Sequence, residues 1–273
     1  MKHSIWAALV LALTAMAWAS VGVTLTPAHE LKQGSILIVN VTSDKPNLKI
    51  DFDGHSSPCF SQADGSCQAI FGVSVDTPAG AYPISVNGEK LAQAVVKETP
   101  FPKQNIVVSK TTNGLQPLPG ELEAIQALKD SLTPVRFWAQ PLMSPTPDCE
   151  NSPFGVKRYH NGVYIHDYHK GVDLRAPYGA PIHAVAGGIV KIAAPKFRLH
   201  GGTVGIDHGQ GLSSIYIHMS KVLVTPGQQV HKGDVIGLIG STGFATGPHL
   251  HWGLYAGGVP VNPDQWVPVK RCS

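Results

Sequence analysis

Residues 181–193 read PIHAVAGGIVKIA, and four similar stretches follow: GGTVGIDHG at 201–209, SSIYIHMS at 213–220, DVIGLIG at 234–240 and HLHWGLY at 249–255. The stretches are short, the first four contain β-branched residues, and glycine or proline recurs within and between them. This pattern is typical of strands joined by turns rather than of helices. The sequence from residue 137 to residue 273 therefore predicts a C-terminal all-β domain.

A second group of short strands is predicted nearer the N-terminus. The alternating, β-branched runs are SILIVNV, LKIDF, AIFGVSV and AYPISV, with turn sequences such as SDKPN and DTPAG between them. Strands of this length and spacing favour a small β-sandwich, which we assign to residues 20–105. No catalytic constellation occurs in this region, so recognition, shielding of a site elsewhere and a spacer role remain open for it.

Residues 106–136 are predicted to link the two domains and to contain one helix at 120–132. The helix is indicated by apolar residues at helical spacing, which we expect to be core contacts: Leu122, Ile125, Leu128 and Leu132. The predicted fold is therefore mainly β, with an N-terminal β-sandwich, one connecting helix and a C-terminal β domain.

The composition limits the function classes. Charged residues make up 14% of the 273 residues and the formal net charge is only +3, while the chain has 29 glycines and 22 prolines. No run of Lys and Arg suggests nucleic-acid binding, and the glycine and proline content argues against coiled coils and long helical bundles. Histidine is unusually frequent, with 13 copies, ten of which lie between His160 and His251.

Residues 1–19 resemble a secretory signal peptide. Lys2 and His3 precede an uncharged apolar run, and Ala17 and Ala19 form an A-x-A cleavage site before Ser20. The alternative, an uncleaved membrane anchor, is disfavoured because the run is shorter than the ~20 residues that span a bilayer. We expect a periplasmic or secreted protein, cleaved between Ala19 and Ser20, without stable membrane insertion afterwards.

Export to an oxidising compartment would favour disulfides, and the cysteine count of four is even. Cys59 and Cys67 bracket a short loop, while Cys149 and Cys272 flank the histidine-rich region. Among the three possible connectivities we favour these two pairs. A zinc site built from thiolates is the alternative, but the chain has no C-x-x-C pair.

Three short strings contain residues suited to metal chemistry: His169-Lys-Gly-Val-Asp173, Tyr216-Ile-His218 and His249-Leu-His251. On a strand, residues at i and i+2 project to the same side, so both imidazoles of the third string can face one pocket. His169 and Asp173 would lie ~13 Å apart on an ideal strand and need a bend, which Gly171 permits. Each string alone is weak evidence, because solvated loop residues and buried core histidines produce the same patterns.

Together with their glycine-rich surroundings, the three strings resemble the lysostaphin-type zinc metallopeptidases, which cleave peptide bonds in bacterial cell walls. The resemblance extends from about Phe154 to Pro263 and includes the lead-in SPFGVKRYHNG. It implies one Zn²⁺ bound by His169, Asp173 and His251, with His218 and His249 as unligated catalytic residues beside a zinc-activated water. It is strongest for Gram-negative members, which implies a peptidoglycan substrate with D-Ala–diaminopimelate cross-links.

The resemblance implies no role for four other histidines: His183, His200, His208 and His231. Three residues ahead of the first string, Tyr164, His160 and His166, could instead line the substrate groove. The N-terminal sandwich could shield that groove, which is a hypothesis only.

Two alternatives belong to other functional classes. A catalytically silent family member that binds the wall or activates another hydrolase is disfavoured, because all five motif positions are intact. A lipoyl- or biotinyl-type carrier, suggested by GQQVHKGDVIGLIG, is disfavoured because no hairpin tip of the M-K-M type occurs.

Overall fold

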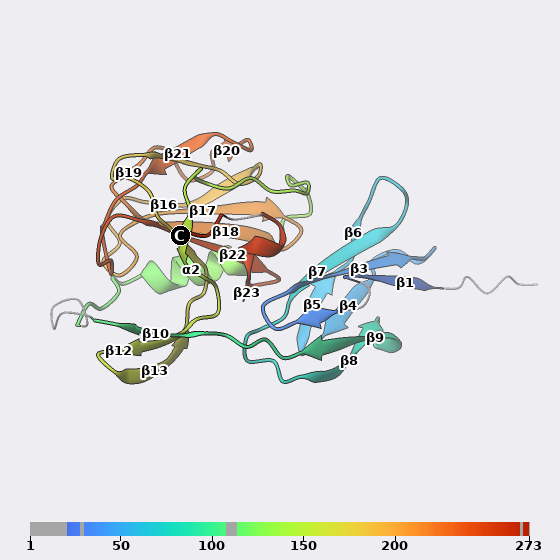
Figure 1. Ribbon diagram of the computed structural model, residues 1–273. Coiled ribbons are helices and arrows are strands. Elements are labelled where there is room, and N and C mark those ends of the chain that lie inside the picture. Colours follow the sequence, from blue (N-terminus) through green and yellow to red (C-terminus); the bar gives the residue numbers. More distant parts are fainter. Residues whose placement is uncertain (1–20, 28–29, 108–113, 268–269, 273) are drawn as a thin grey trace, which may run out of the picture.

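The computed structural model describes residues 21–27, 30–107, 114–267 and 270–272, so the predicted signal peptide lies outside the described residues. The described chain is mainly β, as predicted, and α2 (Glu121–Lys129) is its single α-helix (Figure 1). Within the described residues, no helix has the length and apolar character needed to cross a membrane.

The N-terminal part consists of two sheets that face each other. The strands of the first, in spatial order, are β1 (Gly22–Thr26), β3 (Ile36–Thr42), β7 (Cys67–Gly72) and β6 (Phe60–Ser61). The strands of the second are β2 (Leu31–Lys32), β9 (Glu89–Lys97), β8 (Gly80–Val86), β4 (Lys49–Phe52) and β5 (His55–Pro58). Their inner faces share one apolar core that includes Leu37, Ile50 and Ile84.

A large antiparallel sheet forms the centre of the C-terminal part. In spatial order its strands are β11 (Glu150–Ser152), β14 (Val172–Leu174), β22 (Leu250–Ala256), β18 (Leu212–Met219), β17 (Gly202–Gly209), β16 (Gly188–Ala194) and β20 (Gln229–Val230), with β23 (Val259–Val261) paired to β22. A short 3₁₀ helix, η1 (Pro263–Gln265), follows β23.

Two smaller sheets accompany the large one. One contains β15 (Pro181–His183), β21 (Val235–Leu238) and β19 (Lys221–Val222). The other contains β10 (Lys103–Ile106), β12 (Lys157–His160) and β13 (Val163–Tyr168). Strand β10, which follows the N-terminal sandwich, pairs in parallel with β12. The chain is therefore hydrogen-bonded to the C-terminal part directly after it leaves the sandwich.

Strand β3 is buried on both of its faces, and this joins the two parts. Successive side chains on a strand point to opposite sides. Leu37 and Val39 belong to the sandwich core, whereas Ile36 and Ile38 belong to the core that contains Trp252. On the neighbouring strand, a Cβ at Gly72 would lie 2.7 Å from Val259 Cβ, so glycine is needed for this close approach. The sandwich is therefore packed against the β22–β23 edge of the large sheet.

Helix α2 is shorter than the predicted helix, and fewer of its predicted apolar residues are buried. Ile125 and Leu128 are buried against Ile192, Ile215 and other large-sheet residues, as expected. Leu122 is 51% exposed and Leu132 is 44% exposed, so the interpretation of these two as core contacts is wrong. The helix ends at Lys129, before Leu132, and only one of its faces packs against the sheet.

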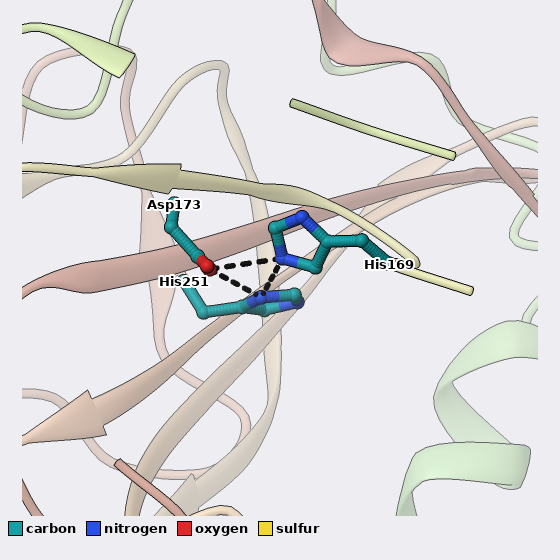
Figure 2. Close-up of side chains that lie close together, drawn as sticks. All are labelled: His169, Asp173 and His251. Atoms are coloured by element: carbon teal, nitrogen blue, oxygen red, sulfur yellow. Dashed lines mark hydrogen bonds and ion pairs between the residues drawn. The ribbon is translucent and has the colours of Figure 1, made fainter. Parts of the chain in front are cut away.

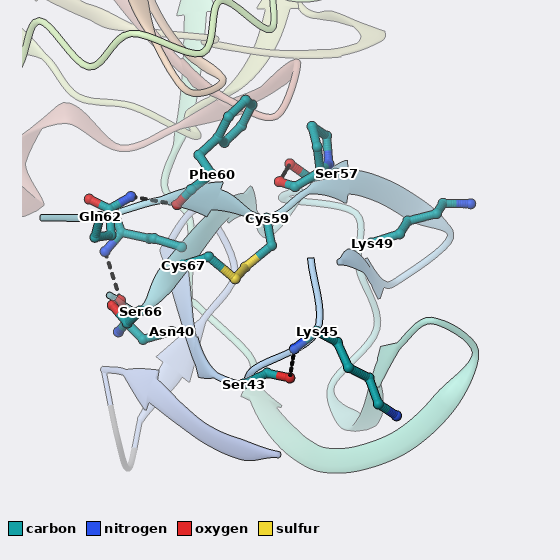
Figure 3. The surroundings of a disulfide bond; sticks show 12 residues. Asn40, Ser43, Lys45, Lys49, Ser57, Cys59, Phe60, Gln62, Ser66 and Cys67 are labelled. Atoms are coloured by element: carbon teal, nitrogen blue, oxygen red, sulfur yellow. Dashed lines mark hydrogen bonds between the residues drawn. A yellow bond between two sulfur atoms is a disulfide. The ribbon is translucent and has the colours of Figure 1, made fainter. Parts of the chain in front are cut away.

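Both predicted disulfides are present. Cys59–Cys67 joins the residue before β6 to the first residue of β7 (Figure 3). Cys149–Cys272 joins residues 123 positions apart and fastens the C-terminus beside β11. The described residues contain no free cysteine, so a thiolate metal site is excluded there.

Candidate functional site

Strand register brings the three predicted metal ligands together. Asp173 on β14 lies directly opposite His251 on β22, so their side chains form a cross-strand pair on one face of the sheet. His169 lies between β13 and β14, and its ring points toward Asp173 and His251 (Figure 2). A Cβ at Gly171 would lie 2.4 Å from the carbonyl oxygen of Trp252, so glycine allows the bend between these strands through close approach rather than through a positive φ.

The three candidate ligand atoms form an almost equilateral triangle. His169 Nε2 lies 2.9 Å from Asp173 Oδ1 and 2.9 Å from His251 Nδ1, and the last two atoms are also 2.9 Å apart. His169 is only 1% exposed, and its Nδ1 lies 2.8 Å from the carbonyl oxygen of Pro153. Because only an N–H can bond to a carbonyl oxygen, Nδ1 carries the proton of the neutral ring. Its Nε2 therefore presents a lone pair to the triangle.

The charge states around the triangle follow from burial. Burial alone would raise the pKa of Asp173, but His169 and His251 hold it well below its ordinary value of 3.8. Burial lowers the pKa of His251 to about 4, although its hydrogen bond with Asp173 acts in the opposite direction. One carboxylate oxygen and two imidazole nitrogens thus converge in a buried place, and each atom can serve as a metal ligand. This is the arrangement expected of a metal site.

His218 and His249 lie next to the triangle, with ring centroids 4.9 Å apart. Each ring is held through Nδ1, because His218 Nδ1 lies 2.8 Å from Thr242 O and His249 Nδ1 lies 2.8 Å from Gly247 O. Their Nε2 atoms make no hydrogen bond within the described chain, and His249 Nε2 lies 3.9 Å from Asp173 Oδ1. Burial and the neighbouring His249 and His251 lower the pKa of His218 to about 3.

The five predicted site residues line one cavity of about 510 Å³. His160 also lines it and stacks on Phe244, in accord with a place in the groove. The side chains of Tyr164 and His166, predicted to lie there as well, are outside the described residues. Tyr216, from the predicted motif Tyr216-Ile-His218, is buried and does not line the cavity. Its hydroxyl is hydrogen-bonded to Ser214 Oγ and Val185 N.

The histidines predicted to have no ligand role lie outside the triangle. His208 is buried and bonded to Gly187 O and Ser214 Oγ, His183 bonds to Gly233 O, and His231 is exposed. His200, for which no role was expected, lines the cavity.

Glu121, the first residue of α2, was not recognised from the sequence. Its carboxylate is fully buried and accepts bonds of 2.9 Å from the backbone N–H groups of Arg198, Leu199 and His200, and one of 2.7 Å from His200 Nδ1. The carbonyl oxygen of His200 in turn accepts from the N–H of His218 at 2.9 Å. Glu121 therefore fixes the loop that supports His218, and no local pattern could have indicated a contact between residues so far apart in sequence.

Helix α2 also forms one wall of the cavity. Leu122, the half-exposed residue that the sequence suggested was a core contact, lines it together with Ile125, Gln126 and Lys129. The sequence signal for the helix was correct, but amphipathic spacing cannot distinguish a face packed in a core from a face that borders a groove.

Comparison with known proteins identifies similar sequences and structures. The family model for peptidase family M23 matches residues 167–263. A Haemophilus influenzae protein named an uncharacterized metalloprotease is 42% identical over 113 residues, which are 41% of this chain and 24% of that protein. DD-carboxypeptidase/endopeptidase Mpg of Neisseria meningitidis is 41% identical over 113 residues, which are 41% of this chain and 26% of that protein.

The chain thus spans about a quarter of the length of these curated relatives. A crystal structure of a candidate M23 peptidase from Pseudomonas aeruginosa covers more of the chain. It is 27% identical, with a TM-score of 0.68, over 86% of this chain and 94% of that one. The described fold, the cluster of His169, Asp173 and His251, and these matches agree: residues 167–263 of this chain form a peptidase family M23 domain.

Proposed function

We propose that this protein is an exported zinc metalloendopeptidase that hydrolyses peptide cross-links of bacterial peptidoglycan, of the D-Ala–diaminopimelate type. The observation that carries the proposal is the convergence of His169, Asp173 and His251 at mutual distances of 2.9 Å, with His218 and His249 beside them in one cavity. All five positions retain residues capable of the chemistry, which disfavours a catalytically silent role.

The donor set fits zinc. Two imidazole nitrogens and one carboxylate oxygen are ligands that zinc accepts, and three protein ligands leave a coordination position for water or substrate. His169, Asp173 and His251 would hold the ion. When bound, zinc would supply Lewis-acid chemistry, lowering the pKa of water toward ~7 and polarising the scissile carbonyl.

His218 and His249 are suited to proton transfer at Nε2. Their Nδ1 atoms are engaged by Thr242 O and Gly247 O, so in the neutral rings Nε2 carries the lone pair. The low pKa of His218 keeps that ring neutral at pH 7. Either ring can accept a proton from the attacking water and return it to the leaving amine, and both can orient the substrate by hydrogen bonds. The division of these roles between the two stays open.

The names of the relatives support the substrate class. The matched Neisseria protein is called a DD-carboxypeptidase/endopeptidase, and a Vibrio cholerae protein that is 39% identical over 112 residues is called a peptidoglycan DD-endopeptidase. DD cleavage is the reaction expected at a D-Ala–diaminopimelate cross-link. Two disulfides agree with export to the periplasm or beyond, because such bonds persist in oxidising compartments.

Shielding of the site by the N-terminal sandwich stays a prediction without support. Along the described chain, the residues that line the cavity begin at Leu122, after the sandwich and its linker strand. The sandwich packs on Val259 and its neighbours at the β22–β23 edge instead.

Digestion of purified sacculi tests the proposed substrate. We expect release of un-cross-linked stem peptides from sacculi with direct D-Ala–diaminopimelate bonds and little release from sacculi with glycine bridges, with mass spectrometry identifying the new termini. Efficient cleavage of the glycine bridges alone would contradict the proposed bond, and no cleavage of either would contradict the proposed function.

A further inference from the structure

Arg158 is a cationic side chain beside the metal-ligand triangle that the mechanism above does not use. It lies on β12 and lines the cavity. Its Nη2 is 3.7 Å from Asp173 Oδ2, which is close enough for an ion pair but beyond hydrogen-bond distance. The guanidinium therefore lies next to the place where substrate must react.

The hydrogen-bonding capacity of Arg158 is largely unused. A guanidinium has five N–H donors, and a buried donor without a partner costs free energy. Arg158 Nε is buried and has no hydrogen-bond partner. Within the described residues, the ion pair with Asp173 is its one contact with an acidic group. Asp173 Oδ1 faces the two imidazole nitrogens at 2.9 Å, and Oδ2 lies 3.7 Å from Nη2, beyond hydrogen-bond distance, so Arg158 stays incompletely satisfied.

The rest of the cavity is also poor in free negative charge. Asp167 lines it but is paired with Lys170 at 2.9 Å. Lys129 lines it from α2, over the ring of Tyr255, and no described carboxylate lies within ion-pair distance of its Nζ. An anionic group on the substrate would therefore be attracted to this part of the groove.

We propose that Arg158 binds a carboxylate of the substrate, the one carried by the residue that supplies the scissile amine. This inference rests on the proposed function. In a D-Ala–diaminopimelate bond, the carbon attached to the scissile nitrogen bears a free carboxylate, so a cation beside the metal ligands is within its reach. The planar guanidinium binds carboxylates through paired N–H donors, which an ammonium cannot reproduce.

A purely structural role for Arg158 makes a different prediction. If the side chain only orients Asp173, its loss will weaken hydrolysis of every substrate equally. If it binds the carboxylate, its loss will affect only substrates that carry that group. Two cross-linked peptides distinguish these cases, one with the diaminopimelate carboxylate free and one with the same group as a carboxamide.

The experiment measures kcat/KM for both peptides and the zinc content of the full protein, of Arg158→Gln and of Arg158→Lys. Lys157→Gln is the matched control, because Lys157 precedes Arg158 on β12, is exposed and does not line the cavity. We expect the unaltered protein to prefer the carboxylate peptide. Arg158→Gln should lose about 10- to 100-fold on that peptide, with its zinc retained and its carboxamide rate nearly unchanged. Arg158→Lys should restore part of the loss.

Three results would overturn the proposal. Equal losses on both peptides would assign Arg158 a role through Asp173 alone. Equal cleavage of both peptides by the unaltered protein would exclude recognition of the carboxylate while leaving the proposed function intact. Cleavage of neither peptide would refute the proposed function, and this inference with it.

Discussion

His251→Ala is expected to abolish zinc binding and peptide hydrolysis together. His251 Nδ1 is one corner of the ligand triangle, at 2.9 Å from both other corners, and alanine leaves only His169 and Asp173 to hold the ion. A site with two protein ligands does not provide the three that catalytic zinc sites use. The measurement is zinc per chain by elemental analysis, alongside hydrolysis of sacculi.

His249→Ala is expected to keep zinc binding and to lose peptide hydrolysis. His249 lies beside the triangle, with its Nε2 3.9 Å from Asp173 Oδ1, and is not one of its corners. The variant should retain zinc and lose about 10²- to 10⁴-fold in kcat, the range for loss of a general acid or base. His231→Ala is the matched control, because His231 is exposed and lies outside the cavity. Full zinc occupancy in His251→Ala, or normal turnover in His249→Ala, would show that these roles are wrongly assigned.

Glu121→Ala should produce the largest loss of stability. It would leave three backbone N–H groups of the Arg198–His200 loop, that of Leu118 and the His200 ring without their shared acceptor. Removing one side of a buried charged network costs about 3–5 kcal/mol. Urea unfolding at pH 7 measures the change. Glu123→Ala, an exposed glutamate in the same helical turn, should change stability by less than about 0.5 kcal/mol.

The contribution of Glu121 should depend on pH. Burial alone would raise its pKa, but the N–H of Leu118 and the side chain and backbone of His200 together lower it from 4.5 to about 2. Because the folded state favours the carboxylate, the stabilisation is fully present above the unfolded pKa near 4.5 and is lost as pH falls toward 2. The difference in free energy of unfolding between the unaltered protein and Glu121→Gln should therefore become smaller as the pH falls from about 4.5 to about 2. A stability difference between the two proteins that stays constant from pH 7 to about pH 2.5 would contradict this role of the Glu121 carboxylate.

The proposed roles of the five site residues were predicted from the resemblance to a family, and strand geometry accounts for part of their arrangement. Because His249 and His251 are two positions apart, their rings can project to the same side. The register of β14 against β22 then places Asp173 opposite His251. The bend at Gly171 was also expected, and the sequence left open which property of glycine allows it. The structure shows close approach to Trp252 rather than a left-handed backbone conformation.

Features that depend on distant contacts were not predictable. Glu121 meets a loop that lies almost eighty residues further along the chain, and Leu122 borders the groove instead of the core. The double burial of β3 was partly encoded, because the run ILIV has no polar position that could face water. The sequence could not indicate which surface would cover its second face.

The most direct test of the account is a single titration in which zinc content and hydrolysis of D-Ala–diaminopimelate cross-links are measured on the same samples of the full protein. A chelator is added first and zinc is then returned. We expect activity to fall in proportion to the zinc removed from His169, Asp173 and His251, and to recover as zinc returns, while His249→Ala binds zinc equally and stays inactive. Undiminished hydrolysis by the metal-free protein would contradict the account.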